Sequence, residues 1–237
     1  MSSSFAYKAF GESIAIAEEL LKIEKAYYPG PPRTKEQKAV EGLRAGVVVM
    51  VVAALERFLR DSMEEHVSDL TKTPFVPWTS LPDNMRITNV YKTLDLAMKG
   101  PPFQEAPPKK DRLVDIHKAC ASIVSDIINP LAFNNTGANP NAATVKSLLK
   151  SLDVSDIFAV IKLRFEKKWG KPIAATFLVD KLNEIVNRRH VVAHTASALG
   201  ISRQQLKESI KFVRILAKLI DGEIKSKINK IRKSYSP

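Results

Sequence analysis

The sequence predicts an all-α protein, a helical bundle with a long proline-rich connector in its middle. Three observations favour this fold class. Glycine is scarce, at 9 of 237 residues, which disfavours a turn-rich β fold. Apolar residues make up 45% of the chain, enough to build a large core. Several long segments repeat apolar residues at intervals of three and four, as amphipathic helices do.

The first half of the chain predicts four helices, at residues 5–27, 34–70, 87–98 and 111–128. The first ends at YYPGPP, because proline and glycine break a helix. The second contains AGVVVMVVAAL, which is apolar on every face, so other helices or a second subunit must cover it. A proline-rich insertion follows over residues 71–110, where Phe75 and Trp78 are expected to pack an extended connector onto the core.

The second half opens with NPLAFNNTGANPNAAT, a turn-rich stretch longer than most connections, which indicates a functional or a mobile loop. Four helices are expected after it, at residues 143–151, 155–169, 173–193 and 202–232. The last helix carries one apolar stripe, formed by Leu206, Ile210, Val213, Ala217, Ile220, Ile224, Ile228 and Ile231. We expect one domain over residues 1–237, with an N-terminal helix and turn at 1–33 and a motif helix and basic helix at 173–232.

The charge balance points to an anionic partner. The chain has 37 Lys and Arg against 25 Asp and Glu, a net charge of +12, which attracts polyanions such as nucleic acid. Lys207, Lys211, Arg214 and Lys218 recur on one face of the last helix, as an RNA backbone requires. The alternative is a solvated, lysine-rich face that serves solubility.

Several features place the protein in a reducing, membrane-free setting. A single cysteine, Cys120, excludes an intramolecular disulfide. The N-terminus lacks the pattern of a signal peptide, and the longest apolar run is about half of the roughly 20 residues that cross a bilayer. We therefore expect a cytoplasmic protein without a membrane segment.

The decapeptide IVNRRHVVAH, residues 185–194, is the strongest candidate for chemistry. Histidine exchanges protons near neutral pH, and arginine offers paired donors to phosphate oxygens. Arg188, Arg189, His190 and His194 therefore suit RNA cleavage without a metal or other cofactor. On an ideal helix Arg189 and His194 lie about 140° apart, so we expect the helix to loosen between them, or a cleft between helices or subunits to gather both.

Other interpretations of these residues stay open. The arginines are also typical of a helix C-terminus, where cations meet the negative end of the dipole, and His194 is compatible with a structural, half-buried histidine. A zinc site would combine His190 and His194 with His117 and Cys120, although two adjacent arginines oppose a dication. The sequence contains no GxxxxGK[ST], GxGxxG or GxSxG motif.

The segment from Arg189 to His194 resembles the R-x(4-6)-H motif of the HEPN superfamily, in which a polar residue such as His190 follows the arginine. Flanking sequences, VDKLNEIVNRRHVVAH, SRQQLKESIKFVRILAKLI and AGVVVMVVAALERFLRDSM, are similar to RiboL-PSP-type members. The resemblance spans roughly residues 39–222 and is specific only around the motif. It implies an all-α HEPN-type fold.

The resemblance also implies a homodimeric, metal-independent endoribonuclease that leaves a 2′,3′-cyclic phosphate and acts as a toxin or phage-defence effector, with an antitoxin or other partner protein. His194 would be the acid or base and Arg189 would hold the scissile phosphate. His190 would position the substrate or His194, and Arg188 would add attraction. Thr195 stands where many relatives have glycine, and Ala196 where partner-silenced toxins have tyrosine. The alternative is a non-catalytic HEPN-like module that binds RNA, a nucleotide or a protein.

Overall fold

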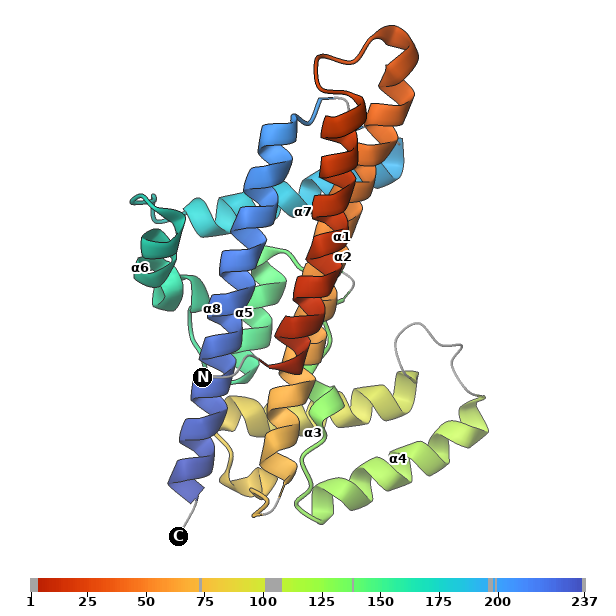
Figure 1. Ribbon diagram of the computed structural model, residues 1–237. Coiled ribbons are helices and arrows are strands. Elements are labelled where there is room, and N and C mark those ends of the chain that lie inside the picture. The colour runs from red at the N-terminus through yellow and green to blue at the C-terminus, as the bar shows by residue number, and fades with distance from the viewer. Residues whose placement is uncertain are drawn as a thin grey trace.

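A computed structural model of the chain describes residues 4–72, 74–100, 108–137, 139–195, 198 and 200–235. Every regular element within these residues is helical, which confirms the all-α fold class. The α-helices are α1 (Phe5–Tyr27), α2 (Gln37–Ser68), α3 (Asp83–Lys99), α4 (Lys109–Val124), α5 (Ala142–Ser151), α6 (Ile157–Trp169), α7 (Phe177–Thr195) and α8 (Arg203–Tyr235) (Figure 1).

Three long helices, α1, α2 and α8, form the central bundle (Figure 1). The apolar stripe predicted for the last helix is buried along its whole length, from Leu206 to Ile231. α1 contributes Phe10 and Ile14, and the Phe10 ring lies 5.4 Å from that of Phe58 on α2. This packing, which removes a continuous apolar face from water, is what holds the bundle together.

The apolar centre of α2 is covered by neighbouring helices on most of its surface but not on all of it. Val47, Val51 and Leu55 are buried against the bundle. Val49, in contrast, is 41% exposed, and Ala53 one turn further is exposed as well. A single protomer therefore leaves two apolar side chains of α2, Val49 and Ala53, open to solvent.

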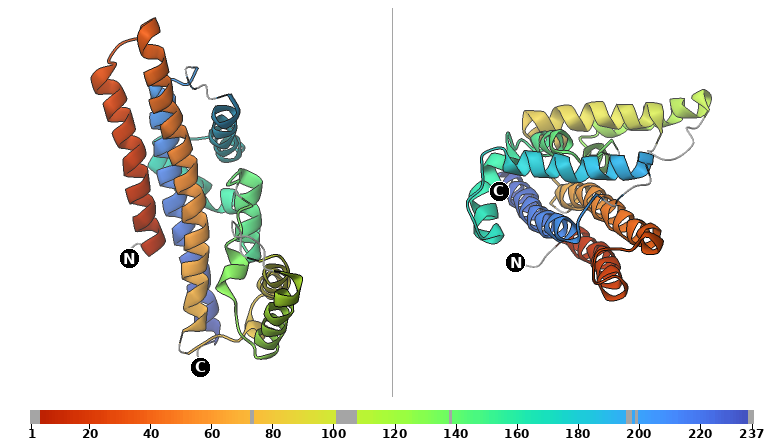
Figure 2. Two further views of the ribbon diagram at one scale, coloured as in Figure 1. Left: turned by 90° about the vertical axis from the view of Figure 1, so that its right-hand side faces the viewer. Right: turned by 90° about the horizontal axis from the view of Figure 1, so that it is seen from above.

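α7 lies across the bundle on the side away from α1 (Figure 2). An aromatic cluster fixes its start: the ring of Phe177 lies 5.8 Å from Trp169 of α6 and 6.2 Å from Phe212 of α8. Phe165 of α6 packs 5.4 Å from Phe212 in the same cluster. These contacts join α6, α7 and α8 at one point, so packed aromatic rings set the orientation of α7.

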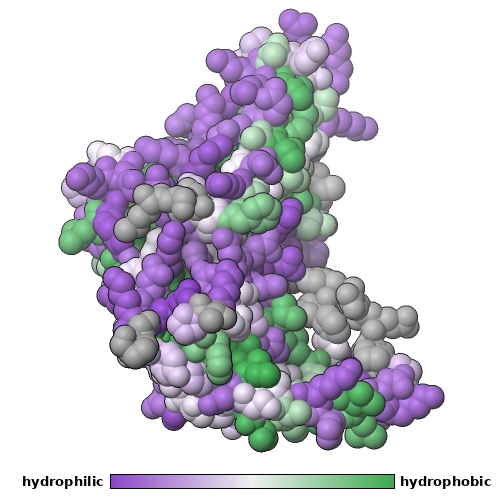
Figure 3. Space-filling view, turned by 60° about the horizontal axis from the view of Figure 1, so that its bottom comes forward, coloured by the Kyte–Doolittle hydropathy of each residue, from purple (hydrophilic) through white to green (hydrophobic). Residues whose placement is uncertain are grey.

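α3 and α4 form an arm at one end of the molecule, and Figure 3 shows apolar side chains gathered on it. Trp78 anchors the connector that leads into the arm, as expected, and its Nε1 donates to the carbonyl of Ile123 at 2.7 Å. The expectation that Phe75 packs beside it is wrong, because Phe75 is 56% exposed. Val76 is buried in its place, held by a hydrogen bond from its N–H to the carbonyl of Leu70. Residues 101–107 of the proline-rich insertion lie outside the described residues.

No helix in the described part of the chain has the length and apolarity needed to cross a membrane.

Candidate functional site

α7 carries the motif, and it is continuous from Phe177 to Thr195. The expected loosening between Arg189 and His194 is therefore wrong. Val192 is only 5% exposed, so packing against the core outweighs its weak helix propensity. The hydroxyl of Thr195 donates to the carbonyl of Val191 at 2.8 Å, within the helix instead of outside it.

The unbroken helix sends the two motif side chains in different directions. At about 100° per residue, Arg189 shares the face of the buried Leu182 and Ile185, whereas His194 lies about 140° away. Arg189 is half-buried, and His194 is exposed. One protomer alone therefore does not bring this guanidinium and this imidazole together.

His194 instead belongs to a polar stripe that the sequence analysis missed. Asn183, Asn187, His190 and His194 follow at intervals of four, three and four, so a continuous helix places all four on one face. The two histidines stand one turn apart, with Cβ atoms about 6 Å from each other. The spacing of these four residues was the signal that could have revealed the stripe. It places them on one face only if the helix is continuous.

Arg188 is held inside the protein. Its guanidinium forms an ion pair with Glu184 one turn earlier, and it lies 3.4 Å from the hydroxyl of Ser209 on α8. The side chain is 15% exposed. Arg188 thus joins α7 to α8, and a contact with phosphate would compete with Glu184.

The basic residues predicted on α8 lie on the far side of that helix from α7. Ser209, which Arg188 reaches, is about 160° around α8 from both Lys207 and Lys211. Lys207, Lys211 and Arg214 line a groove of about 680 Å³ that they share with α1, and Lys218 is exposed further along α8.

Two of these cations already have partners within the protein. Lys211 donates to the carbonyl of Trp169 at 2.9 Å and lies 4.5 Å from the centre of its ring. Arg214 donates to Glu18 at 2.8 Å. The groove is basic overall, but it does not adjoin the motif in the same protomer.

A cleft runs along α7 beside the polar stripe. One part of it, about 840 Å³, reaches from Asp180 past Arg188 to Thr195. A second part, about 430 Å³, lies between α7 and the start of α5. Both parts are lined by Asn183 and Asn187, so they meet along one side of the motif helix.

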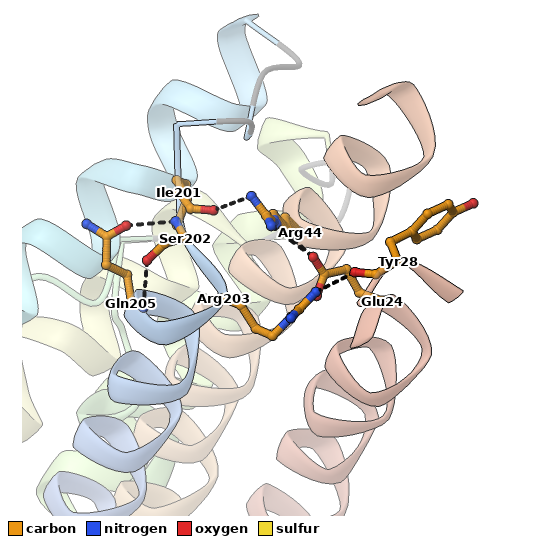
Figure 4. Close-up of polar contacts among 7 residues, drawn as sticks. All are labelled: Glu24, Tyr28, Arg44, Ile201, Ser202, Arg203 and Gln205. Carbon is orange, nitrogen blue, oxygen red and sulfur yellow. Dashed lines mark hydrogen bonds and ion pairs between the residues drawn. The ribbon is translucent and has the colours of Figure 1, made fainter. Parts of the chain in front are cut away.

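The segment that follows α7 is fixed by a buried carboxylate (Figure 4). Glu24 of α1 accepts hydrogen bonds from both Arg44 and Arg203, and only 1% of its side chain is exposed. Arg44 also donates to the carbonyl of Ile201 at 3.0 Å, and Arg203 to that of Tyr28 at 2.7 Å. Burial alone would raise the pKa of Glu24, but the two arginines outweigh it and hold that pKa below its ordinary value.

The start of α8 is capped in the same region (Figure 4). The N–H of Ser202 donates to the Gln205 side chain at 2.7 Å, and the N–H of Gln205 donates to the Ser202 hydroxyl at 3.2 Å. The N–H of Ala198 donates to Glu41 of α2 at 3.0 Å. The chain leaving the motif is thus tied to α1, α2 and α8. Ala196, which stands at the tyrosine position of partner-silenced toxins, lies outside the described residues.

No group of three or more His, Cys, Asp or Glu side chains among the described residues is placed to hold a metal ion. His117 and Cys120, the remaining ligands of the zinc alternative, are exposed on α4, in the arm. The structure thus offers nothing that favours the zinc interpretation.

A family model described as RiboL-PSP-HEPN matches residues 12–226, from within α1 to within α8 and including the whole motif. No curated protein and no solved structure matches the chain.

Proposed function

We propose that this chain, which belongs to the RiboL-PSP-HEPN family, is a metal-independent endoribonuclease. The RNA 2′-hydroxyl attacks the adjacent phosphate, the 5′-oxygen leaves, and a 2′,3′-cyclic phosphate remains on the upstream fragment. The observation that carries the proposal is the pair formed by the half-buried His190 and the exposed His194, two proton-exchanging groups one turn apart on a continuous helix.

The roles follow from where each side chain lies. His194, exposed at the end of α7, takes the proton of the 2′-hydroxyl or gives one to the leaving oxygen. His190, on the same face, orients the substrate or His194. Arg189 neutralises charge that develops on the phosphate, because a guanidinium is always charged and donates two parallel hydrogen bonds.

Arg189 and His194 point about 140° apart in one chain, so we place the active site between two protomers. In a homodimer, Arg189 of one copy meets a phosphate held by His194 of the other. The exposed apolar residues Val49 and Ala53 of α2 support this assembly, because a second copy would cover them. Such a two-fold interface uses the same surface on both copies.

The basic face of α8 then attracts RNA without contacting the cleaved bond. Lys207, Lys211, Arg214 and Lys218 lie on the other side of α8 from the motif, so they raise the local concentration of RNA without touching the scissile phosphate. Arg188, which is paired with Glu184, adds attraction only for a phosphate that displaces this carboxylate.

The test is RNA cleavage in EDTA, with analysis of the product ends. Wild type is expected to leave cyclic phosphates, and His194→Ala and Arg189→Ala are expected to be inactive. His117→Ala is the matched control, since it removes an exposed histidine from α4. Absence of cyclic-phosphate ends from wild type, or full activity of either motif variant, would refute the proposal.

Mixing the two inactive variants tests the shared site. If Arg189 and His194 act across the interface, each mixed dimer regains one intact site. Random mixing then restores about a quarter of wild-type activity. Mixing variants whose two residues act within one chain would restore nothing.

A non-catalytic module that binds RNA, a nucleotide or a protein partner is the second candidate. The engagement of Arg188 with Glu184 and the presence of Thr195 after the motif histidine favour it. It predicts binding without turnover, and affinity that falls steeply with salt if phosphates dominate.

As a nuclease, the protein would act in the cytoplasm as a toxin or phage-defence effector restrained by a partner protein. Growth arrest on expression of wild type, and normal growth with His194→Ala, is the expected result.

A further inference from the structure

The narrower part of the cleft beside α7 is unusually rich in asparagine. It lies between the turn-rich segment before α5 and the outer face of α7, and it encloses about 430 Å³. Its polar lining consists of Asn139, Asn141, Asn183, Asn187 and Lys146. A space of this size is within the range of small-ligand sites, and amide groups both donate and accept hydrogen bonds.

Two of these amides are fixed in orientation by the first turn of α5. The Oδ1 of Asn141 accepts from the N–H of Thr144 at 2.9 Å, and the Oδ1 of Asn183 accepts from the N–H of Ala142 at 3.0 Å. Because each oxygen is tied to the backbone, the Nδ2 group of each residue is the part left to donate. Two residues that line the cleft therefore carry amide donors whose orientation is fixed.

One residue that lines the cleft also carries an acceptor without a partner among the described residues. The Oδ1 of Asn139 is buried and has no hydrogen-bond partner among the described residues. Burying such an atom without a donor costs free energy that a ligand N–H would recover. At the rim, Asn187 is exposed and presents its amide on the outer face of α7.

This combination distinguishes between ligands. Phosphate oxygens only accept, so they would leave Asn139 unsatisfied. A nucleobase edge that carries a donor beside an acceptor satisfies both kinds of group. An asparagine amide pairs in this way with N6 and N7 of adenine, whereas the same edge of guanine offers two acceptors. Bases splayed out of single-stranded RNA are read through such edges.

We infer that this cleft binds an adenine base of the RNA substrate. The inference rests on the proposed function, because it places the base beside the histidines that would cut the strand. Asn187 precedes His194 by seven residues on the same face of an unbroken helix, about 10 Å along its axis. The base recognised therefore lies a few nucleotides from the cleaved bond, and cleavage is selective for sequence.

The test measures binding in the His194→Ala background, so that no cleavage is needed. Labelled oligo(A), oligo(C), oligo(G) and oligo(U) are titrated with the full chain and followed by fluorescence anisotropy. Oligo(A) is expected to bind about tenfold more tightly than the others. Asn187→Ala should remove this preference and leave the affinity for oligo(U) unchanged. Asn229→Ala, which removes an exposed asparagine from α8, should alter neither.

Equal affinity for all four oligonucleotides would overturn the inference. So would an Asn187→Ala variant that weakens all four alike, since that marks a phosphate contact, or one that retains the preference for oligo(A). Asn139→Ala provides a second variant with the same expected loss, because it deletes an acceptor that has no partner within the described residues. Selective binding by a wild type that never cleaves would sink the nuclease proposal and leave the base site standing. Cleavage by a wild type that shows no base preference would refute the base site and leave the nuclease proposal standing.

Discussion

The buried ion pairs of Glu24 with Arg44 and Arg203 provide the most quantitative prediction. Side-chain exposure is 1% for Glu24, 12% for Arg44 and 22% for Arg203, so Glu24→Ala leaves two guanidinium groups in a largely dry site without their shared carboxylate. Removing one partner from a buried ion pair costs about 3 to 5 kcal/mol. For a chain of this size, each kcal/mol lowers Tm by about 2 to 4 °C, so a fall of roughly 10 °C is expected.

Thermal and urea denaturation followed by circular dichroism measure this effect. The matched control is Glu19→Ala on the same helix, which breaks an exposed pair with Lys22 whose side chains are 61% and 72% exposed. An exposed pair of this kind contributes between about 0 and 1 kcal/mol. A loss below about 1 kcal/mol for Glu24→Ala, indistinguishable from the control, would refute the reasoning.

The pKa of Glu24 determines how the stability difference between wild type and Glu24→Ala depends on pH. Burial raises that pKa, but the hydrogen bonds from Arg203 and Arg44 leave it below the ordinary value of 4.5. A carboxyl whose pKa is lower in the folded state stabilises the protein above its unfolded pKa. The difference in stability between wild type and Glu24→Ala is therefore constant at neutral pH and shrinks as pH falls below 4.5 toward the folded pKa.

Four further predictions follow from single side chains. His194→Ala should lower cleavage at least about 100-fold while changing stability by under about 0.5 kcal/mol, measured on the same preparation, because His194 is exposed. Asp221→Asn should lower the free energy of unfolding in urea by about 2 kcal/mol, because the buried carboxylate bonds to His66. Burial raises the pKa of Asp221, but hydrogen bonds from His66 and Ser4 keep it below 3.8. The stabilisation by this carboxylate is therefore lost only below pH 3.8. Gly170→Ala should cost about 1 to 2 kcal/mol in thermal unfolding, since Gly170 ends α6 at φ +94°. Lys218→Ala should reduce the salt dependence of RNA binding by about one phosphate contact and leave the cleavage rate at saturation unchanged.

Periodicity predicted much of the fold because the long helices bury one face each. The apolar stripe of α8 could be identified residue by residue, and the first helix was expected at the limits it has, Phe5 and Tyr27. The error at Phe75 has a local cause. Aromatic character favours burial, but a single backbone hydrogen bond turned Val76 inward and left Phe75 outside.

The candidate site was predicted only in part, because its polar groups come from distant parts of the chain. Glu24 meets Arg203 across 179 positions, and Asn183 meets the start of α5 across 41. Neither pairing has a sequence period that would reveal it. The motif residues themselves were proposed from their chemistry and their resemblance to a known motif. The 140° between Arg189 and His194 suggested a loosened helix, which the packing of Val192 prevents.

The absence of that break determines how the proposed chemistry must be divided. A helix that loosened within the motif would let one protomer hold Arg189 and His194 against the same phosphate. A straight α7 instead groups His190 and His194 with two asparagines on one face, and turns the half-buried Arg189 about 140° away from His194. Proton transfer and base recognition then fall to one protomer, and charge neutralisation to the other. The variant Val49→Glu puts a charge at the exposed Val49 of α2 and should prevent dimerisation. It should therefore abolish cleavage while leaving the oligo(A) preference intact. Cleavage that survives in a monomeric Val49→Glu variant would instead place the whole site within one chain.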